Sequence, residues 1–145
     1  MQTKNTNLRL QREAKKAFKE QQTMIKKQGK ITNNFVYGPN PENLNEWFFV
    51  VFGLDDHFKG GYYLGSVVCP DSYPQKPPSI KVHTMNGRFC IDEGICLSVT
   101  EYHPESWNPA WTVSHIILGL ITFWLSDEDT AGVEYHNSPA DARKQ

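Results

Sequence analysis

The sequence predicts one α+β domain, in which an antiparallel sheet is preceded and followed by a helix. Residues 8 to about 24 and residues 112–125 repeat apolar side chains with a helical period, and residues 31–83 contain short β-patterned segments joined by short loops. Strands this close in sequence pair antiparallel, because a parallel pair needs a crossover of about a dozen residues or more. The length of 145 residues fits a single domain, which we expect to span residues 1–145.

The first predicted element is a helix with a thin apolar stripe, which favours docking on one side of the protein body. The stripe contains Leu10, Ala14, Ala17 and Gln21. The basic side chains that point away from it are Arg12, Lys15, Lys16 and Lys19. Gly29 and Lys30 follow and are expected to end the helix.

The β-patterned segments are residues 31–37, 46–53, 62–69 and 79–83. The first should end at residues 38–41, where the sequence Gly-Pro-Asn-Pro predicts a turn. Residues 46–53 are apolar on both faces and rich in aromatic and β-branched side chains, which predicts a central strand. Residues 70–78 contain four prolines and are excluded as a central strand, because proline lacks the backbone donor.

Residues 84–111 keep neither the strand nor the helix period, and such long irregular stretches in compact domains are usually functional. The helix that follows, at residues 112–125, is expected to be capped by Thr112 or Ser114. Its inward side chains should be Val113, Ile116, Ile117, Leu120, Ile121 and Trp124. The tail, residues 126–145, is polar and predicted to be weakly structured.

Charge is divided unevenly along the chain. Residues 1–30 carry nine Lys or Arg against two Glu, a net charge of +7, whereas the remainder carries six basic and fourteen acidic residues, a net charge of −8. A basic arm on an acidic body predicts a charged partner for the arm, either an acidic protein surface or nucleic acid. The alternative is that these basic side chains only form a solvated helix face. The absence of motifs that read nucleic-acid bases favours this alternative.

The sequence favours a cytosolic protein. Its longest strongly apolar run, residues 116–125, is ten residues long, whereas a membrane span needs about 20. The N-terminus lacks the apolar core of a secretory signal.

Three cysteines do not suggest a disulfide framework. Cys90 and Cys96 near His83 and His103 raise the question of zinc, but the paired spacing of structural zinc ligands is missing, so we expect no metal.

Ordered motifs in residues 73–111 make the sequence specific. They are YPQKPP at 73–78, TMNGRF at 84–89, ICLS at 95–98 and HPESWNPAW at 103–111. Together they resemble the ubiquitin-conjugating enzyme family, and more closely its branch of tail-anchored endoplasmic-reticulum members related to yeast Ubc6. The resemblance covers about residues 8–138. It implies an N-terminal helix, a four-stranded antiparallel meander, a long active-site loop and C-terminal helices.

The resemblance implies that Cys96 is the catalytic cysteine, which accepts ubiquitin from the activating enzyme as a thioester. The residue suits this chemistry, because a thiolate is both a good nucleophile and a good leaving group. Cys69, at the end of an apolar strand, is expected to be a buried inert thiol. Cys90 stays open as the alternative nucleophile because of its position in the irregular segment.

Asn86 matches the Asn of the family's His-Pro-Asn motif, whose amide stabilises the oxyanion or holds the active-site loop. Here the motif reads Thr84-Met85-Asn86, so the rigidity of proline is lost just before the Asn. The alternative is that Asn86-Gly87 only forms a turn, for which this dipeptide is a strong signal.

Ser98 occupies a position where many lysine-directed relatives carry Asp, so another base is expected to deprotonate the incoming nucleophile. We predict that His103 is this general base and can serve a hydroxyl as well as an amine, because histidine is the side chain best matched to general-base catalysis at neutral pH. The alternative is a loop histidine that only binds backbone groups. The nearer branch transfers ubiquitin to Ser and Thr hydroxyls as well as to Lys.

Two surfaces are expected to bind protein partners. In the family, RING ligases bind the loop around Gln75 and the loop around Pro109 and Ala110, together with the first helix. Gln75 replaces a frequent aromatic or apolar anchor. The acidic ubiquitin-fold domain of the activating enzyme is expected to bind Arg9, Arg12, Lys15 and Lys16. This interpretation gives the basic arm a protein partner and not nucleic acid.

Three alternatives remain for the function: an inactive ubiquitin-binding variant, a conjugating enzyme for another ubiquitin-like modifier, and an SH3 or WW ligand that uses the PxxP match at residues 74–77. We expect no cofactor, because ATP is used by the activating enzyme, and no membrane contact by this chain itself. The branch implies a role in endoplasmic-reticulum-associated degradation, at the cytosolic face of that membrane if the full-length protein carries the family's C-terminal anchor.

Overall fold

A computed structural model of the chain describes residues 4–55, 58–95 and 104–126. A long helix is followed by four strands and, after an irregular segment, by a second helix. The helices are α1 (Lys4–Gln28) and α2 (Val113–Trp124), and the strands are β1 (Phe35–Asn40), β2 (Asn43–Phe52), β3 (Tyr62–Val68) and β4 (Ser79–Val82). The α+β class and the order of elements agree with the prediction.

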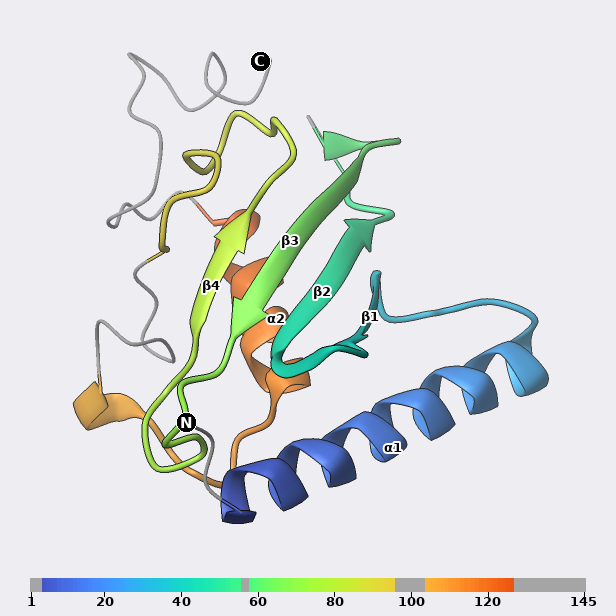
Figure 1. Ribbon diagram of the computed structural model, residues 1–145. Coiled ribbons are helices and arrows are strands. Elements are labelled where there is room, and N and C mark those ends of the chain that lie inside the picture. The colour runs from blue at the N-terminus through green and yellow to red at the C-terminus, as the bar shows by residue number, and fades with distance from the viewer. Residues whose placement is uncertain (1–3, 56–57, 96–103, 127–145) are drawn as a thin grey trace.

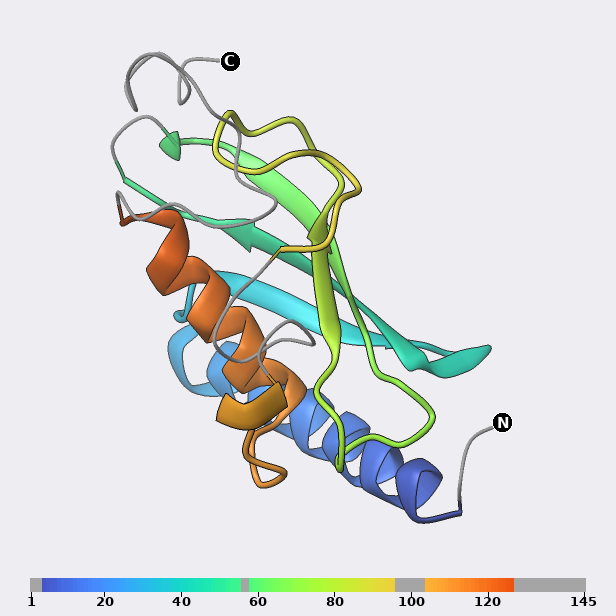
Figure 2. The same cartoon turned by 90° about the vertical axis from the view of Figure 1, so that its left-hand side faces the viewer.

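The four strands form one antiparallel sheet in the order β1-β2-β3-β4, which confirms the predicted meander. Figures 1 and 2 show α2 against one face of this sheet, while α1 runs along the β1 side. The prediction of a central position for residues 46–53 is confirmed, because β2 lies between β1 and β3.

Helix α1 extends beyond the predicted range at both ends. Residues 4–28 contain neither Gly nor Pro, and Gly29 ends the helix with a φ of 74°, a conformation that glycine adopts without strain. Thr6 fixes the first turn, because its hydroxyl donates to the carbonyl oxygens of Asp71 and Tyr73.

The predicted boundaries of the first strand were wrong. Strand β1 runs from Phe35 to Asn40, so it continues through the expected turn at residues 38–41, with Pro39 paired with Trp47. An edge strand tolerates this proline, because its missing N–H faces away from a ladder. The register shifts between Pro39 and Asn40.

The core lies between the sheet and α2. Strand β2 alternates, with Trp47, Phe49 and Val51 buried, whereas Phe48 on the outer face is 40% exposed. From α2 the buried side chains are Val113, Ile116, Ile117, Leu120 and Trp124, as predicted, and Ile121 is partly buried against them. The Thr112 hydroxyl accepts a hydrogen bond from the His115 backbone N–H and caps the helix.

The irregular segment behaves as expected where the structure describes it. Within residues 84–95, Ile91 forms an isolated bridge with Val82, and a short 3₁₀ turn follows at Pro104–Ser106. Residues 96–103 and the predicted tail beyond residue 126, with any further C-terminal helix, lie outside the described residues.

Candidate functional site

Three segments that are distant in sequence meet at the N-terminal end of α1. The Arg9 guanidinium donates to the Pro109 carbonyl oxygen at 2.9 Å and to the Trp111 carbonyl oxygen at 2.8 Å. It also lies over the ring of Tyr73, 5.5 Å from the ring centre. Arg9 therefore joins the first helix to the two loops that were expected to bind ligases.

Glu13 is the centre of this junction. Its carboxylate is buried and accepts hydrogen bonds from the Arg9 guanidinium, the Tyr73 hydroxyl and the Val113 backbone N–H. Val113 is the first residue of α2, where unpaired N–H groups favour a negative charge. Burial, and then the Glu13 charge, raise the pKa of Tyr73 above its ordinary range, so its hydroxyl remains a donor.

The two loops are also joined to each other. The Trp107 indole N–H donates to the Pro74 carbonyl oxygen at 2.7 Å, and the rings of Trp107 and Tyr73 lie 6.2 Å apart. Trp107 is buried and Trp111 packs against the core. The Tyr73–Pro74 peptide bond is cis.

The predicted ligase-binding residues lie on the outer sides of these joined loops. Gln75 is exposed in a turn in which its N–H donates to the Ser72 carbonyl oxygen. Pro109 and Ala110 are exposed in a second turn, closed by a hydrogen bond from the Ala110 N–H to the Asn108 side chain. Both loops are thus held from inside while their tips face solvent.

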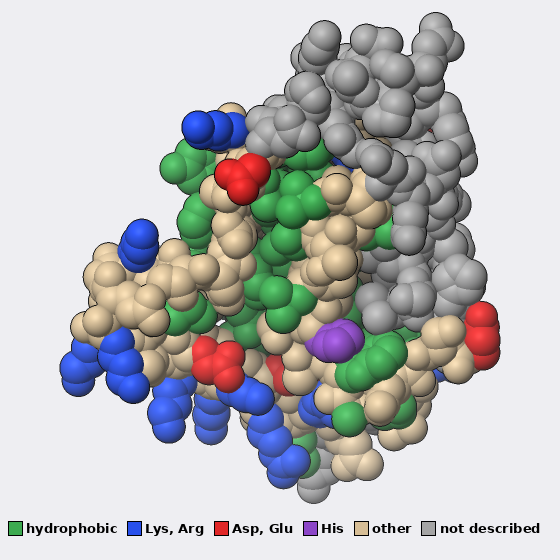
Figure 3. Space-filling model, turned by 180° about the vertical axis from the view of Figure 1, so that it is seen from behind, with side chains coloured by type: hydrophobic (Ala, Val, Ile, Leu, Met, Phe, Trp, Pro, Cys, Tyr) green, Lys and Arg blue, Asp and Glu red, His purple; other side chains and the backbone are tan. Residues whose placement is uncertain are grey.

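The four basic residues predicted for the activating enzyme are not equivalent. Arg12, Lys15 and Lys16 are exposed, and Figure 3 shows Lys and Arg side chains along the edge of the molecule that α1 forms. Arg9 instead directs its guanidinium to Glu13 and to two backbone carbonyls. The i, i+4 spacing of Arg9 and Glu13 was a signal for this pair, whereas the carbonyl partners lie about a hundred residues away.

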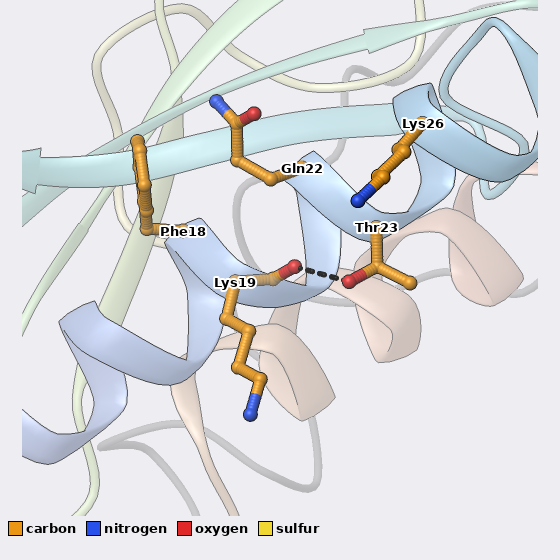
Figure 4. A pocket seen from close by; sticks show the side chains of 5 residues that line it. All are labelled: Phe18, Lys19, Gln22, Thr23 and Lys26. Carbon is orange, nitrogen blue, oxygen red and sulfur yellow. Dashed lines mark hydrogen bonds between the residues drawn. The ribbon is translucent and has the colours of Figure 1, made fainter.

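A shallow hollow continues this basic surface along the C-terminal half of α1. Its volume is about 420 Å³, and it is lined by Phe18, Lys19, Gln22, Thr23 and Lys26. Figure 4 shows the Thr23 hydroxyl hydrogen-bonded to the Lys19 carbonyl oxygen, at 2.8 Å. The Phe18 ring is 68% exposed, so the surface offers one large apolar contact beside its ammonium groups.

Asn86 is buried and is fully used inside its own loop. Its amide NH₂ donates to the carbonyl oxygens of Thr84 and Phe89, and its amide oxygen accepts from the N–H groups of Arg88 and Phe89. Gly87 next to it has a φ of 75°, so the Asn-Gly dipeptide also forms a turn. Met85, which stands where the family motif has proline, is exposed.

The chain that leads to Cys96 lies along β4. The Asp92 N–H donates to the Val82 carbonyl oxygen and the Ile95 N–H to the Ile80 carbonyl oxygen, and Ile95 is completely buried. Cys96 comes directly after this anchored residue in sequence. Cys96, Ser98 and His103 themselves lie outside the described residues.

The other two cysteines differ in environment. Cys69 is buried, as expected, and this burial raises the pKa of its thiol well above its ordinary value, which keeps it protonated and unreactive. Cys90 is partly exposed. Neither takes part in a disulfide bond within the described ranges.

Two negative findings apply to residues 4–55, 58–95 and 104–126. No helix in these ranges is both long and apolar enough to cross a membrane. No three His, Cys, Asp or Glu side chains there are grouped so that they could hold a metal ion.

Comparison with known families decides the classification. The family model described as ubiquitin-conjugating enzyme matches residues 9–139, which is most of the chain. The chain belongs to the ubiquitin-conjugating enzyme family. The match includes both joined loops, Asn86 and Cys96.

Curated members of the family are similar over about two thirds of this chain. It is 46% identical over 95 residues to Ubiquitin-conjugating enzyme E2 6 of Candida glabrata, covering 65% of this chain and 39% of that protein. It is 44% identical over 101 residues to Probable ubiquitin-conjugating enzyme E2 33 of Arabidopsis thaliana, covering 69% and 42%. The expected relation to yeast Ubc6 agrees with these matches. The chain spans about two fifths of the length of both relatives.

Solved structures of ubiquitin-conjugating enzymes share the fold. A putative ubiquitin conjugating enzyme from Plasmodium yoelii has a TM-score of 0.66 at 23% identity, with 88% of this chain and 77% of that chain covered. The H. polymorpha enzyme Pex4p, solved with the soluble domain of Pex22p, has a TM-score of 0.68 at 21% identity, with 85% and 80% covered. These likenesses confirm the predicted ubiquitin-conjugating fold.

Proposed function

We propose that this chain is the catalytic domain of a ubiquitin-conjugating enzyme that carries ubiquitin as a thioester on Cys96. The observation that supports this most strongly is that Cys96 lies within the family match and directly follows Ile95 in the sequence, a buried residue whose N–H is hydrogen-bonded to β4. Cys69 is too deeply buried to compete, because its raised pKa disfavours the thiolate. Cys90 remains the alternative that substitution has to exclude.

The proposed reaction has two acyl transfers. The Cys96 thiolate attacks the carbonyl of the thioester between ubiquitin and the activating enzyme, and the thiolate of the activating enzyme leaves. A substrate amine or hydroxyl then attacks the new thioester and loses its proton to a base, and the Cys96 thiolate leaves. No cofactor takes part in either transfer, because ATP is consumed earlier by the activating enzyme.

We assign Asn86 to holding the active-site loop. All of its donor and acceptor groups are used by the backbone of residues 84–89, which supports this role over direct stabilisation of an oxyanion. The rigid turn replaces the stiffness that proline supplies in the usual family motif.

The base in the second transfer is proposed to be His103, with Ser98 in the place of the usual carboxylate. An imidazole can accept a proton from a hydroxyl or an amine near neutral pH. Single-turnover discharge of charged enzyme to free serine and to free lysine tests this assignment. We expect His103→Ala to slow both reactions, and unchanged rates would remove His103 from the mechanism.

The protein partners follow from the two surfaces. We propose that the activating enzyme binds the exposed basic residues Arg12, Lys15 and Lys16, which suit an acidic partner. Arg9 is proposed to act indirectly, by holding the Pro109–Ala110 loop. A RING ligase is proposed to contact this loop and Gln75.

The branch that the sequence resembles implies a role at the cytosolic face of the endoplasmic reticulum, in endoplasmic-reticulum-associated degradation, and the relatives named Ubiquitin-conjugating enzyme E2 6 agree with that branch. The protein substrates in this proposal are proteins of that quality-control route. A membrane anchor in the full-length protein would be needed for this location.

A charging assay tests the proposed function. Purified chain is incubated with activating enzyme, ubiquitin and ATP, and is run on a gel with and without thiol reductant. We expect a reducible adduct, heavier by one ubiquitin, that forms with Cys90→Ala and is lost with Cys96→Ala. An adduct that forms only with another ubiquitin-like protein would mean that the chain carries that modifier and not ubiquitin. Failure to form an adduct with any modifier would favour a binding module.

A further inference from the structure

Three polar side chains contact one another beside the segment that leads to Cys96. The Nε2 atom of His83 lies 2.8 Å from the Ser66 hydroxyl oxygen, and its Nδ1 atom is hydrogen-bonded to the Asp92 carboxylate. Ser66 belongs to β3, His83 follows the last residue of β4, and Asp92 lies in the irregular segment. One imidazole therefore links the sheet to this segment.

The order Ser, His, Asp also occurs in hydrolytic triads, but Ser66 is not placed for nucleophilic attack. It lies within a regular strand, paired with Phe48 on one side and Lys81 on the other, and is only 4% exposed. A nucleophilic serine has to meet a substrate carbonyl next to free backbone donors. Ser66 is instead a buried anchor for the imidazole.

The main chain near Asp92 continues the same connection. Ile91 bridges to Val82, and the N–H groups of Asp92 and Ile95 bind carbonyl oxygens of β4. Asp92 has a φ of 61°, a left-handed conformation that Asp adopts more readily than most residues other than Gly. Its side chain is 67% exposed, and the hydrogen bond to His83 ties it to the sheet side.

We propose that His83 is a positioning residue for Cys96: by joining Ser66 to Asp92 it holds residues 91–95 against β4 and fixes the point from which the chain enters Cys96. The proposal rests on the proposed function of Cys96. Only four peptide units separate Asp92 from Cys96, a reach of about 14 Å at full extension, so a change at Asp92 is passed on over a short distance. Displacement of a reacting group by about 1 Å can lower a rate by about a hundredfold.

Either protonation state of His83 has the donors and acceptors that the two hydrogen bonds need. The neutral ring donates from Nδ1 to Asp92 and accepts at Nε2 from the Ser66 hydroxyl, and the charged ring donates from both nitrogens. The link between Ser66 and Asp92 therefore depends on the donors and acceptors of the His83 side chain. Substitution of His83 tests this link more directly than a change of pH does.

The experiment compares His83→Phe, which removes both bonds, with His83→Gln, whose amide keeps one donor and one acceptor. His115→Phe serves as the control, because His115 is an exposed histidine that stacks on Trp111 in a different part of the molecule. Two quantities are measured for each variant: hydrogen exchange of the Asp92 and Ile95 amides, and discharge of the charged enzyme to free lysine.

We expect His83→Phe to accelerate exchange of both amides and to slow discharge, each by about tenfold, without faster exchange at Phe49 in β2. We expect His83→Gln to stay within about threefold of the unsubstituted protein, and His115→Phe to change neither quantity. Unchanged exchange in His83→Phe would overturn the proposed link. Faster exchange with an unchanged discharge rate would overturn the positioning role.

A failure of the proposed function is distinguishable from a failure of this inference. If the unsubstituted protein forms no thioester, the rate at which iodoacetamide alkylates Cys96 replaces discharge as the second readout. A several-fold change of that rate in His83→Phe supports positioning even then, and equal alkylation rates in the two proteins contradict it.

Discussion

The Glu13 carboxylate accepts a 2.8 Å hydrogen bond from the backbone N–H of Val113, one hundred residues further along the chain. This bond joins the first helix to the beginning of the second. The same carboxylate binds Arg9 and Tyr73. Tyr73 precedes one loop of the proposed ligase surface in the sequence, and Arg9 donates to backbone carbonyl oxygens of the other loop. The junction therefore stabilises the fold and determines where these loops lie.

Glu13→Ala is expected to lower the free energy of unfolding by about 3 kcal/mol, because it leaves buried donors without their acceptor. Chemical denaturation measures this change. Glu20→Ala is a matched control on the same helix, since Glu20 is half exposed and pairs with Lys16 at 3.8 Å. Its expected effect is about 0.5 kcal/mol or less. Equal losses in the two variants would contradict the importance of the junction.

Gly65→Ala should destabilise the protein by about 1 to 3 kcal/mol through overpacking. An added Cβ atom would lie 2.2 Å from the Phe49 ring and 2.5 Å from the Lys81 carbonyl oxygen. Gly38→Ala, also in a strand, meets no atom within 4 Å and is expected to be nearly neutral. Thermal unfolding of both variants checks the difference. Similar melting temperatures would show that the surroundings of Gly65 accommodate an added Cβ atom without loss of stability.

Cys69 should make stability fall at alkaline pH. Burial raises the pKa of its thiol well above 9.0 in the folded protein, whereas the thiol of the unfolded chain titrates near that value. Above pH 9 the unfolded state therefore loses a proton that the folded state keeps, and the free energy of unfolding decreases.

This pH dependence is measured by denaturation at pH 8, 9 and 10. Between pH 9 and pH 10 the unsubstituted protein should lose about 1 kcal/mol more than Cys69→Ala. Tyr73, whose pKa is also raised by burial, affects both proteins equally and cancels in the comparison. Parallel curves for the two proteins would mean that the Cys69 thiol ionises in the folded state as easily as in water.

Lys15→Glu is expected to slow charging by the activating enzyme about tenfold at low ionic strength, because it reverses a charge on the proposed docking surface. Lys59→Glu makes the same charge change at an exposed residue of the β2–β3 connection, which lies away from α1 (Figures 1 and 2), and should leave the rate within about twofold. Added salt should reduce the difference. Equal slowing by both substitutions would indicate a general charge effect and not a docking site.

Local patterns predicted much of this architecture. The order of the strands and the inward face of α2 depend on short-range patterns that the sequence shows directly, and Thr112 is one of the two caps that the sequence predicted. The end of β1 was predicted wrongly, because Pro39 acts as a turn signal in isolation and is tolerated only since β1 lies at the sheet edge.

The side-chain connections could not be predicted in the same way. Arg9 lies in a basic helix, and its carbonyl partners on residues 109 and 111 become neighbours only when α1 packs beside the second loop. The same holds for His83, whose partners come from β3 and from the irregular segment. Cys96, Ser98 and His103 remain predictions from the sequence, since they lie outside the described residues.

The central claim is tested most directly by Cys96→Ser in the charging assay. Serine keeps a nucleophilic atom at the same position but forms an oxygen ester, which a thiol reductant does not cleave as it cleaves a thioester. We predict an adduct of one ubiquitin that resists reductant and is released by mild alkali. A reducible adduct that persists in Cys96→Ser would contradict the account, because the thioester would then lie on another cysteine.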